Sequence, residues 1–107
     1  MKRLPPAIQE KHRYMEFRLH GESLELGEVV ETVWSATLNY LGEKGSAEAD
    51  FWVIGNRFNE EKQRGVIKVN RDREDDLRAA ITLVEKAGGK EAFFEITGVS
   101  GTLKGLE

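Results

Sequence analysis

The residues from Arg64 to Arg71 read Arg-Gly-Val-Ile-Lys-Val-Asn-Arg, a short β-branched run that carries cations in a chain whose net charge is −3. β-Branched residues favour strands, and successive side chains of a strand point to opposite faces of its sheet. One face of this strand would carry Ile67 and Val69, and the other Val66, Lys68 and Asn70. The run therefore predicts a central strand with one apolar face, and a second face that is either merely solvated or open to a polar ligand.

The order of the other periodic segments limits the fold further. Residues 13–20 alternate between apolar and polar side chains and predict a first strand, and residues 50–56 and 91–97 predict two more. Residues 25–41 have the apolar spacing of a helix that ends at Gly42, before a loop over 42–48, and Trp34 lies on its apolar stripe, where we expect it in the core. A second helix would start at Asp72 as its N-cap and close at Gly88-Gly89.

The resulting order is strand, helix, strand, strand, helix, strand, which is typical of the ferredoxin-like or RRM-like α+β sandwich. We expect a four-stranded antiparallel sheet with both helices on one face and the first and third strands in the middle. The open face would then have Tyr14, Arg18, Val66, Lys68 and Asn70 near its centre. Residues 13–107 would form this single domain, after an extended basic arm over residues 1–12 that contains Pro5-Pro6.

Composition excludes several classes of protein. The chain has no cysteine, which rules out thiol nucleophiles and cysteine metal sites. No apolar run approaches the roughly 20 residues of a membrane span, and the N-terminus lacks the apolar core of a signal peptide. We expect a soluble, cytoplasmic protein.

Charge is distributed in blocks of alternating sign. Residues 1–21 carry five Lys/Arg against two acids, residues 22–50 one against seven, residues 51–73 six against three, and residues 74–107 four against seven. Blocks of this kind are either plain solvated faces or the basic and acidic faces of one small domain. In the second case an acidic protein still presents a positive surface.

No set of residues predicts catalysis. His12 and His20 lack the spacing of metal ligands and are interpreted as surface histidines. The glycine-rich stretch from Gly98 to Gly105 is not a P-loop and is interpreted as a turn, although its amides could approach a phosphate. The outward positions of the third strand hold no aromatic residue, so base stacking on this strand is improbable, and recognition of the RNA backbone by cations remains.

Several short stretches together resemble one family. They are Met1-Lys2-Arg3-Leu4-Pro5-Pro6, Lys11, Arg13-Tyr14, Glu28-Val29-Val30, Trp34, Leu41-Gly42-Glu43-Lys44-Gly45, Phe51-Trp52, Gly65-Val66-Ile67-Lys68-Val69-Asn70-Arg71, Leu77-Arg78-Ala79-Ala80 and Gly98-Val99-Ser100-Gly101-Thr102-Leu103-Lys104. In this order they resemble the archaeal ribonuclease P protein component 2 family, relatives of a eukaryotic subunit of the same ribonucleoprotein. The Lys-x-Leu-Pro-Pro arm combined with the Gly-Val-Ser-Gly-Thr-x-Lys tail is the most specific part.

This resemblance implies a subunit of the enzyme that removes the 5′ leader from precursor tRNA. The RNA subunit with Mg²⁺ would perform the hydrolysis, and this chain would bind no cofactor or metal itself. Its partners would be the ribonuclease P RNA and the TIM-barrel-like protein component 3, with precursor tRNA contacted indirectly. Component 3 or a second copy of this chain would cover an edge strand or the Phe51-Trp52 strand. The expected RNA-binding residues are Arg18, Arg64, Lys68, Asn70, Arg71, Lys2, Arg3, Lys11, Arg13 and Lys104.

Two other functions on the same fold stay open. An acylphosphatase-like hydrolase would need an arginine cradle after the first strand, where residues 20–25 are acidic and have no arginine. A small-ligand regulatory domain would use the acidic first helix as the mouth of its site. Both rest on analogy of fold alone.

Overall fold

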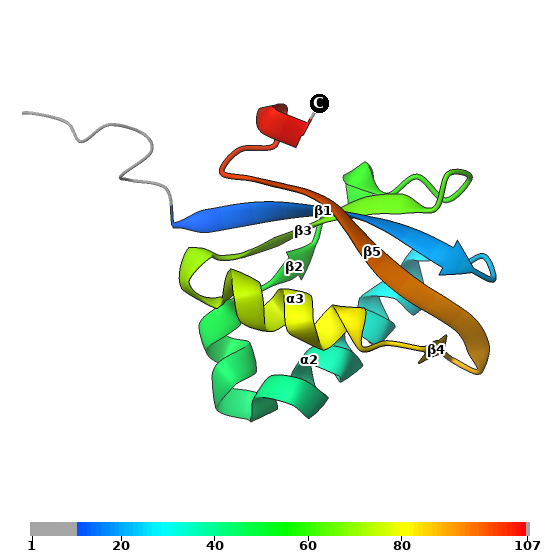
Figure 1. Ribbon diagram of the computed structural model, residues 1–107, viewed down its shortest axis with the longest axis horizontal. Helices are drawn as coiled ribbons and strands as arrows, with labels where there is room; N and C mark the ends of the chain where they lie inside the picture. The colour runs from blue at the N-terminus through cyan, green and yellow to red at the C-terminus, as the bar shows by residue number, and fades with distance from the viewer. Residues whose placement is uncertain (1–10, 107) are drawn as a thin grey trace, which may run out of the picture.

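The computed structural model describes residues 11–106 as an antiparallel sheet packed against two helices (Figure 1). The strands are β1 (His12–Gly21), β2 (Trp52–Val53), β3 (Arg64–Asn70), β4 (Lys86–Ala87) and β5 (Lys90–Ser100), and the helices are α2 (Leu26–Ala49) and α3 (Glu74–Thr82). The described residues also form three short 3-10 helices: η1 (Gly55–Arg57), η2 (Arg71–Arg73) and η3 (Lys104–Leu106). Residues 1–10 of the expected arm lie outside the described part, whereas its last two residues are described and His12 is the first residue of β1.

The sheet has five strands in the order β2-β3-β1-β5-β4, so the expected count of four is wrong. The fifth strand is β4, which pairs with the start of β5 through Lys86 and Glu91. The predicted contact between the first and third strands is confirmed, because Met15 lies opposite Ile67 in the β1–β3 register. The ferredoxin-like assignment rested on six elements in the order strand, helix, strand, strand, helix, strand, and the additional strand β4 between α3 and β5 departs from that order.

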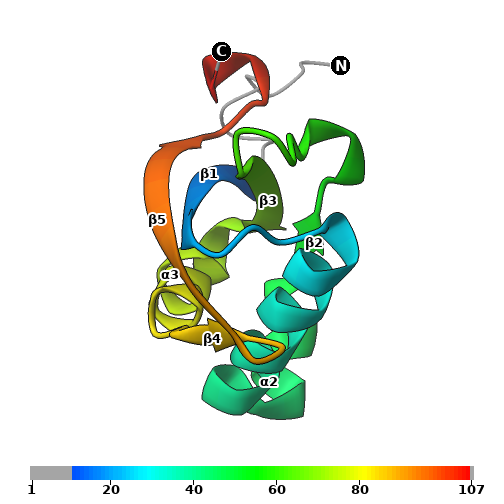
Figure 2. The same ribbon diagram turned by 90° about the vertical axis from the view of Figure 1, so that its right-hand side faces the viewer.

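Both helices cover the same face of the sheet and leave η3 on the other side (Figure 2). The alternation seen in the sequence explains this arrangement, because the apolar members of each strand point toward the helices. These are Met15, Phe17 and Leu19 from β1, Ile67 and Val69 from β3, and Ala92 and Phe94 from β5, all buried together with Val29, Val33, Leu77 and Ile81 of the helices. The apolar alternation predicted for these three strands is thus confirmed on this face, although Ile96 of β5 is only partly buried.

The first helix differs from expectation in its length and in its tryptophan. The helix is interrupted at Gly42, as predicted, because Gly42 has the non-helical φ 74° and ψ −179°. Only glycine adopts such a conformation readily. The residues that follow were expected to form a loop, but they form a second helical segment that continues α2 to Ala49 across this kink. Trp34 is 48% exposed and packs against Phe51 with ring centroids 4.6 Å apart and ring planes tilted by 53°, so its assignment to the core is wrong.

Two other predicted elements are shorter than expected. Only Trp52 and Val53 of residues 50–56 form a strand, because the chain then turns into η1. The second helix begins at Glu74 after an N-cap at Arg73, while Asn70 accepts the amide of Asp72 at the start of η2. It ends at Thr82, and the glycine pair expected to close it forms instead the turn of the β4–β5 hairpin.

The face away from the helices is partly covered by the C-terminal residues. A Cβ placed on Gly98 of β5 would lie 3.4 Å from Leu106 of η3, so the tail folds back over the end of that strand. Val66 points to this side, yet only 5% of it is exposed, so its expected position on an open centre is wrong. No helix among residues 11–106 is long and apolar enough to cross a membrane.

Candidate nucleic-acid interface

Three of the predicted cations lie on β1 and β3 and point away from the helices. Arg18 is directly opposite Arg64 in the β1–β3 register, and Lys68 is opposite Tyr14. These positions alternate with the buried Phe17, Ile67 and Val69, which fixes the face to which they belong. We call this side of the sheet, with Tyr14, Arg18, Arg64 and Lys68, the outer face.

The cations of the outer face differ from those of the helix layer in their partners. Within residues 11–106, neither Arg18, Arg64 nor Lys68 forms an ion pair. On the helix side three cations are paired: Arg73 with Glu48 and Asp76, Arg78 with Glu74, and Lys90 with Glu28. Lys44 of α2 and Lys86 of β4 form no ion pair among residues 11–106. Hydrogen bonds to Asp76 and then Glu48 raise the pKa of the Arg73 guanidinium above its ordinary value. Unpaired cations leave a positive potential that a paired cation does not.

The remaining predicted residues are scattered around this face. Arg71 follows β3, and its amide donates to the carbonyl of Lys11, which brings the two exposed cations to the same corner. Asn70 uses its side chain to accept the amide of Asp72, so that oxygen already has a donor. Lys104 is exposed on η3, on the outer side of the sheet.

Arg13 does not join the outer face. It lies opposite Val69 in the register and alternates with Tyr14, so it projects to the helix side, where its guanidinium donates to the carbonyl of His12 over 3.1 Å. Lys2 and Arg3 fall outside the described residues.

Sequence reasoning missed Trp52 as part of this face. Trp52 lies opposite Lys68 and Val53 opposite the buried Ile67, so the tryptophan projects to the outer face, and it is 69% exposed. The apolar run around it indicated a buried strand, whereas the structure forms only two residues of strand there. The available signal was that Trp52 follows the buried Phe51, since neighbours in a strand face opposite ways.

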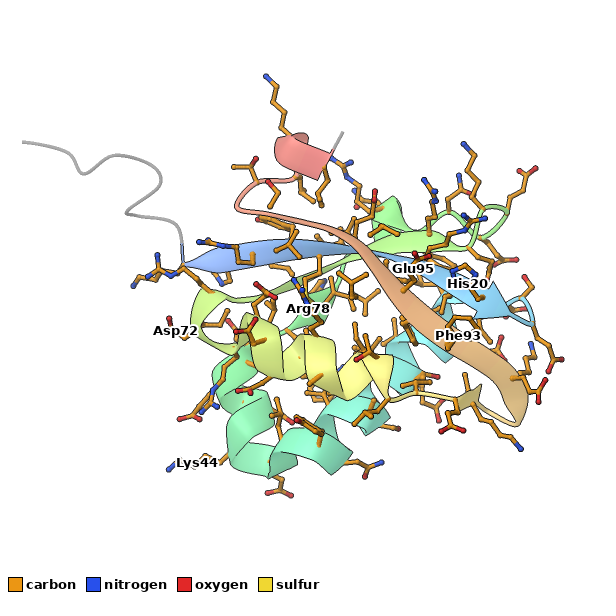
Figure 3. The ribbon with its side chains drawn as sticks, in the orientation of Figure 1. His20, Lys44, Asp72, Arg78, Phe93 and Glu95 are labelled. Carbon is orange, nitrogen blue, oxygen red and sulfur yellow. The ribbon has the colours of Figure 1, made fainter. Side chains whose placement is uncertain are left out.

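The far end of the outer face carries an aromatic pair with an acid. His20 stacks on Phe93 with ring centroids 4.8 Å apart, and its Nε2 lies 2.8 Å from the Glu95 carboxylate (Figure 3). Phe93 is 52% exposed. The carboxylate makes this end less positive than the end formed by Lys68, Arg71 and Lys11, which is therefore the better place for a polyanion.

A groove of about 580 Å³ lies in the helix layer, away from the outer face. Its wall includes Glu28, Glu31, Tyr40, Leu83 and Lys86 from α2, α3 and the following residues. Across residues 11–106, no three His, Asp or Glu side chains are grouped as metal ligands would be. The groove is thus a mixed polar and apolar surface with an acidic rim.

The fold and the site together define a small α+β protein whose sheet is covered by helices on one face and carries unpaired cations on the other. The chain belongs to the Rpp14/Pop5 family, whose model matches residues 13–107. This result confirms the resemblance found in the sequence.

Curated relatives and a solved structure agree with the family. Ribonuclease P protein component 2 of Thermococcus gammatolerans is 46% identical over 107 residues, which cover 99% of this chain and 88% of that protein. The protein of the same name from Methanocaldococcus jannaschii is 34% identical over 105 residues, 97% of this chain and 75% of its own length. A chain in the cryo-EM structure of yeast ribonuclease MRP shares the fold with a TM-score of 0.70 at 12% identity, over 88% of this chain and 76% of that chain.

Proposed function

We propose that this chain is a protein subunit of ribonuclease P that supports removal of the 5′ leader from precursor tRNA by binding the RNA subunit. The observation that carries the proposal is the difference between the two layers, since Arg73, Arg78 and Lys90 on the helix side are paired with acids. Arg18, Arg64 and Lys68 on the outer face form no ion pair among the described residues. Family membership and relatives named ribonuclease P protein component 2 support the same conclusion.

The proposed mechanism is electrostatic. Where helices of a folded RNA come together, their phosphates repel one another, and protein cations placed there relieve the repulsion and release counterions. Arg18, Arg64, Lys68 and Arg71 would make these contacts. Arg13, Asn70, Lys104 and the arm residues Lys2, Arg3 and Lys11 are secondary candidates. The RNA, with its own Mg²⁺, would supply the chemistry of phosphodiester hydrolysis, while this chain would lower the Mg²⁺ concentration at which that RNA folds.

The partner protein would occupy a separate part of the surface. We assign component 3, or a second copy of this chain, to the free edge of β2, because an unpaired edge offers backbone donors and acceptors. The acidic helix layer is unsuited to phosphates and adds a second surface for such a protein. Sedimentation of the chain alone and with component 3 tests this assignment, and a monomer in both samples would contradict it.

The direct test of function is a reconstitution from the RNA subunit and the other protein subunits of a relative, with and without this chain. We expect omission to raise the Mg²⁺ concentration needed for half-maximal cleavage of precursor tRNA, and addition of the chain to restore it. An unchanged Mg²⁺ requirement would contradict the proposed function.

The groove in the helix layer supports one second candidate, a small-ligand regulatory domain. Its acidic rim at Glu28 and Glu31 would favour a cationic ligand. Retention of the chain on heparin at low salt discriminates the two functions, because the RNA-binding function requires retention and the ligand-binding function does not.

A further inference from the structure

The outer face holds a row of three side chains that electrostatics alone does not explain. Trp52 on β2 and Tyr14 on β1 both lie directly opposite Lys68 on β3, so an indole, an ammonium and a phenol occupy adjacent positions across three strands. Neighbouring strands are about 4.8 Å apart, which places the backbones of the two aromatic residues about 10 Å apart with the lysine between them. The row ends at Ser100 of β5, opposite Tyr14.

The two ends of the row are different. At one end the tail closes over β5, since a Cβ on Gly105 would lie 2.1 Å from the Ser100 hydroxyl oxygen. At the other end Trp52 lies on the edge strand and is 69% exposed, more than any other large hydrophobic side chain of the described residues. An indole that is this exposed contributes little to the core, so its presence beside an unpaired lysine needs another explanation.

The geometry points to a nucleobase-binding platform: Trp52 and Tyr14 stack on unpaired bases of an RNA strand, while Lys68 contacts the phosphate between them. An aromatic face attracts any base, and a lysine between two rings matches the alternation of bases and phosphates along a single strand. A duplex keeps its base faces stacked inside, so it would meet only the lysine. The expectation that base stacking is improbable was based on β3 alone, whereas the two rings come from the strands on either side of it.

This inference rests on the proposed function and adds the kind of RNA that is bound. The full-length Trp34→Phe variant makes Trp52 the only indole, since the chain has two tryptophans, and Trp52→Phe leaves Trp34 as the matched control. Each is titrated with single-stranded oligouridylate, with an RNA duplex of equal length, and with ribonuclease P RNA, while tryptophan emission and anisotropy are recorded. We expect oligouridylate and the folded RNA to quench Trp52 but not Trp34, and the duplex to quench neither.

Affinity and its salt dependence separate stacking from charge. Trp52→Ala and Tyr14→Ala should each weaken binding to oligouridylate about 5- to 100-fold with an unchanged slope of log affinity against log salt. Lys68→Ala should lower that slope by about 0.7. Trp52→Phe and Tyr14→Phe keep a ring and should retain most of the affinity. An unchanged thermal midpoint for Trp52→Ala shows that the loss does not come from unfolding.

These experiments test the nucleobase-binding platform separately from the proposed electrostatic binding of RNA. Salt-dependent binding with no quenching of Trp52, and with Trp52→Ala binding as tightly as the wild type, would overturn the platform and leave the electrostatic function intact. No binding to any of the three RNAs would overturn both. Quenching of Trp52 by a protein subunit of the particle, and not by RNA, would assign the tryptophan to a protein interface and also overturn the platform.

Discussion

The two faces of the sheet are built from the same strands and have opposite properties. Toward the helices, β1 and β3 present Met15, Phe17, Ile67 and Val69, and all four are 0% exposed. On the outer face the intervening positions hold Tyr14, Glu16, Arg18, Arg64 and Lys68, none of which is buried, together with Val66, which is 5% exposed. Neighbours along one strand can therefore be changed to test stability and binding separately.

The largest effect should come from Phe17→Ala on the covered face. The ring packs against Phe94 and Phe58 at centroid distances of 5.2 and 6.5 Å, and its loss leaves a cavity in the core. We expect the free energy of unfolding to fall by about 3–5 kcal/mol, measured by urea denaturation. Arg18→Ala, one residue further on the outer face, is the control and should change it by less than about 0.5 kcal/mol. A comparable loss in both variants would break the distinction between the faces.

A smaller loss of stability should follow from adding one carbon atom next to the ring of Phe17. Gly65 lies opposite Phe17, and a Cβ there would be 2.6 Å from its Cζ atom. Gly65→Ala therefore forces the ring to move, and we expect unfolding to become easier by about 1–3 kcal/mol.

The matched control for that substitution is Gly27→Ala in the first turn of α2, where a Cβ would meet nothing within 4 Å. Alanine is the better helix former, so this variant should be more stable than the wild type. If Gly65→Ala were also stabilising in urea denaturation, the covered face would be packed more loosely than its burial indicates.

The covered face could be predicted from the sequence because its rule is local. A side chain two positions from Met15 points the same way, and apolar alternation identified the core members of β1, β3 and β5. The errors on this side arose where tertiary contacts decide the outcome. Nothing local indicates that a second helical segment follows the break at Gly42, or that Trp34 packs against Phe51 and stays half exposed instead of entering the core.

The outer face was predictable only in part. Alternation placed Arg18 and Lys68 correctly, but the residues beside them depend on strand pairing, which the sequence does not specify. Trp52 reaches Lys68 only through the β2–β3 register, and Val66 is buried although it points to the outer side. Both features depend on contacts between residues far apart in the sequence, and the strand assignments alone do not specify those contacts.

The next largest expected effect is a loss of RNA affinity when cations of the outer face are removed. The double variant Lys68→Ala/Arg71→Ala removes two cations. Lys68 has no ion-pair partner among the described residues, and Arg71 has only a weak one, because its Nε lies 4.0 Å from the Asp72 carboxylate. We expect affinity for ribonuclease P RNA to fall about tenfold at low salt, and the salt slope to drop by somewhat less than two, measured by filter binding. Thermal stability should remain that of the wild type.

Lys44→Ala is the control for this loss of positive charge. Lys44 lies in the helix layer, on the side of the molecule away from η3 (Figure 3). Its removal should leave RNA affinity close to that of the wild type. Equal weakening by Lys44→Ala and by either outer-face substitution would mean that net charge, and not the face on which it lies, determines binding.

The smallest expected effect is a change in thermal stability, and it tests whether the acids of the helix layer stabilise the fold. The Glu28 carboxylate accepts a hydrogen bond from the Glu25 amide over 2.9 Å and lies 3.1 Å from the Lys90 ammonium. Both contacts lower the pKa of Glu28 from its ordinary value of 4.5, and the hydrogen bond from the Glu25 amide has the larger effect. A pKa lowered by folding stabilises the native state above the unfolded value, and the contribution disappears as the pH falls through the folded value. Glu28→Gln should therefore slightly lower the thermal midpoint at pH 7. The difference should shrink as the pH falls below 4.5 and vanish once the pH is below the lowered pKa of the folded state.

Glutamine can still accept the Glu25 amide, so this substitution removes the charge and keeps the cap. Glu31→Gln, on the same helix and exposed, is the control for a change in net charge alone. If both variants lose the same stability at pH 7, the effect comes from the overall charge of the helix layer. If only Glu28→Gln loses stability, and RNA affinity is unchanged in both variants, then Glu28 stabilises the fold and does not affect RNA binding. Together with the effects of the outer-face substitutions, this result would assign stability to the acids on the helix side and RNA binding to the cations on the outer face.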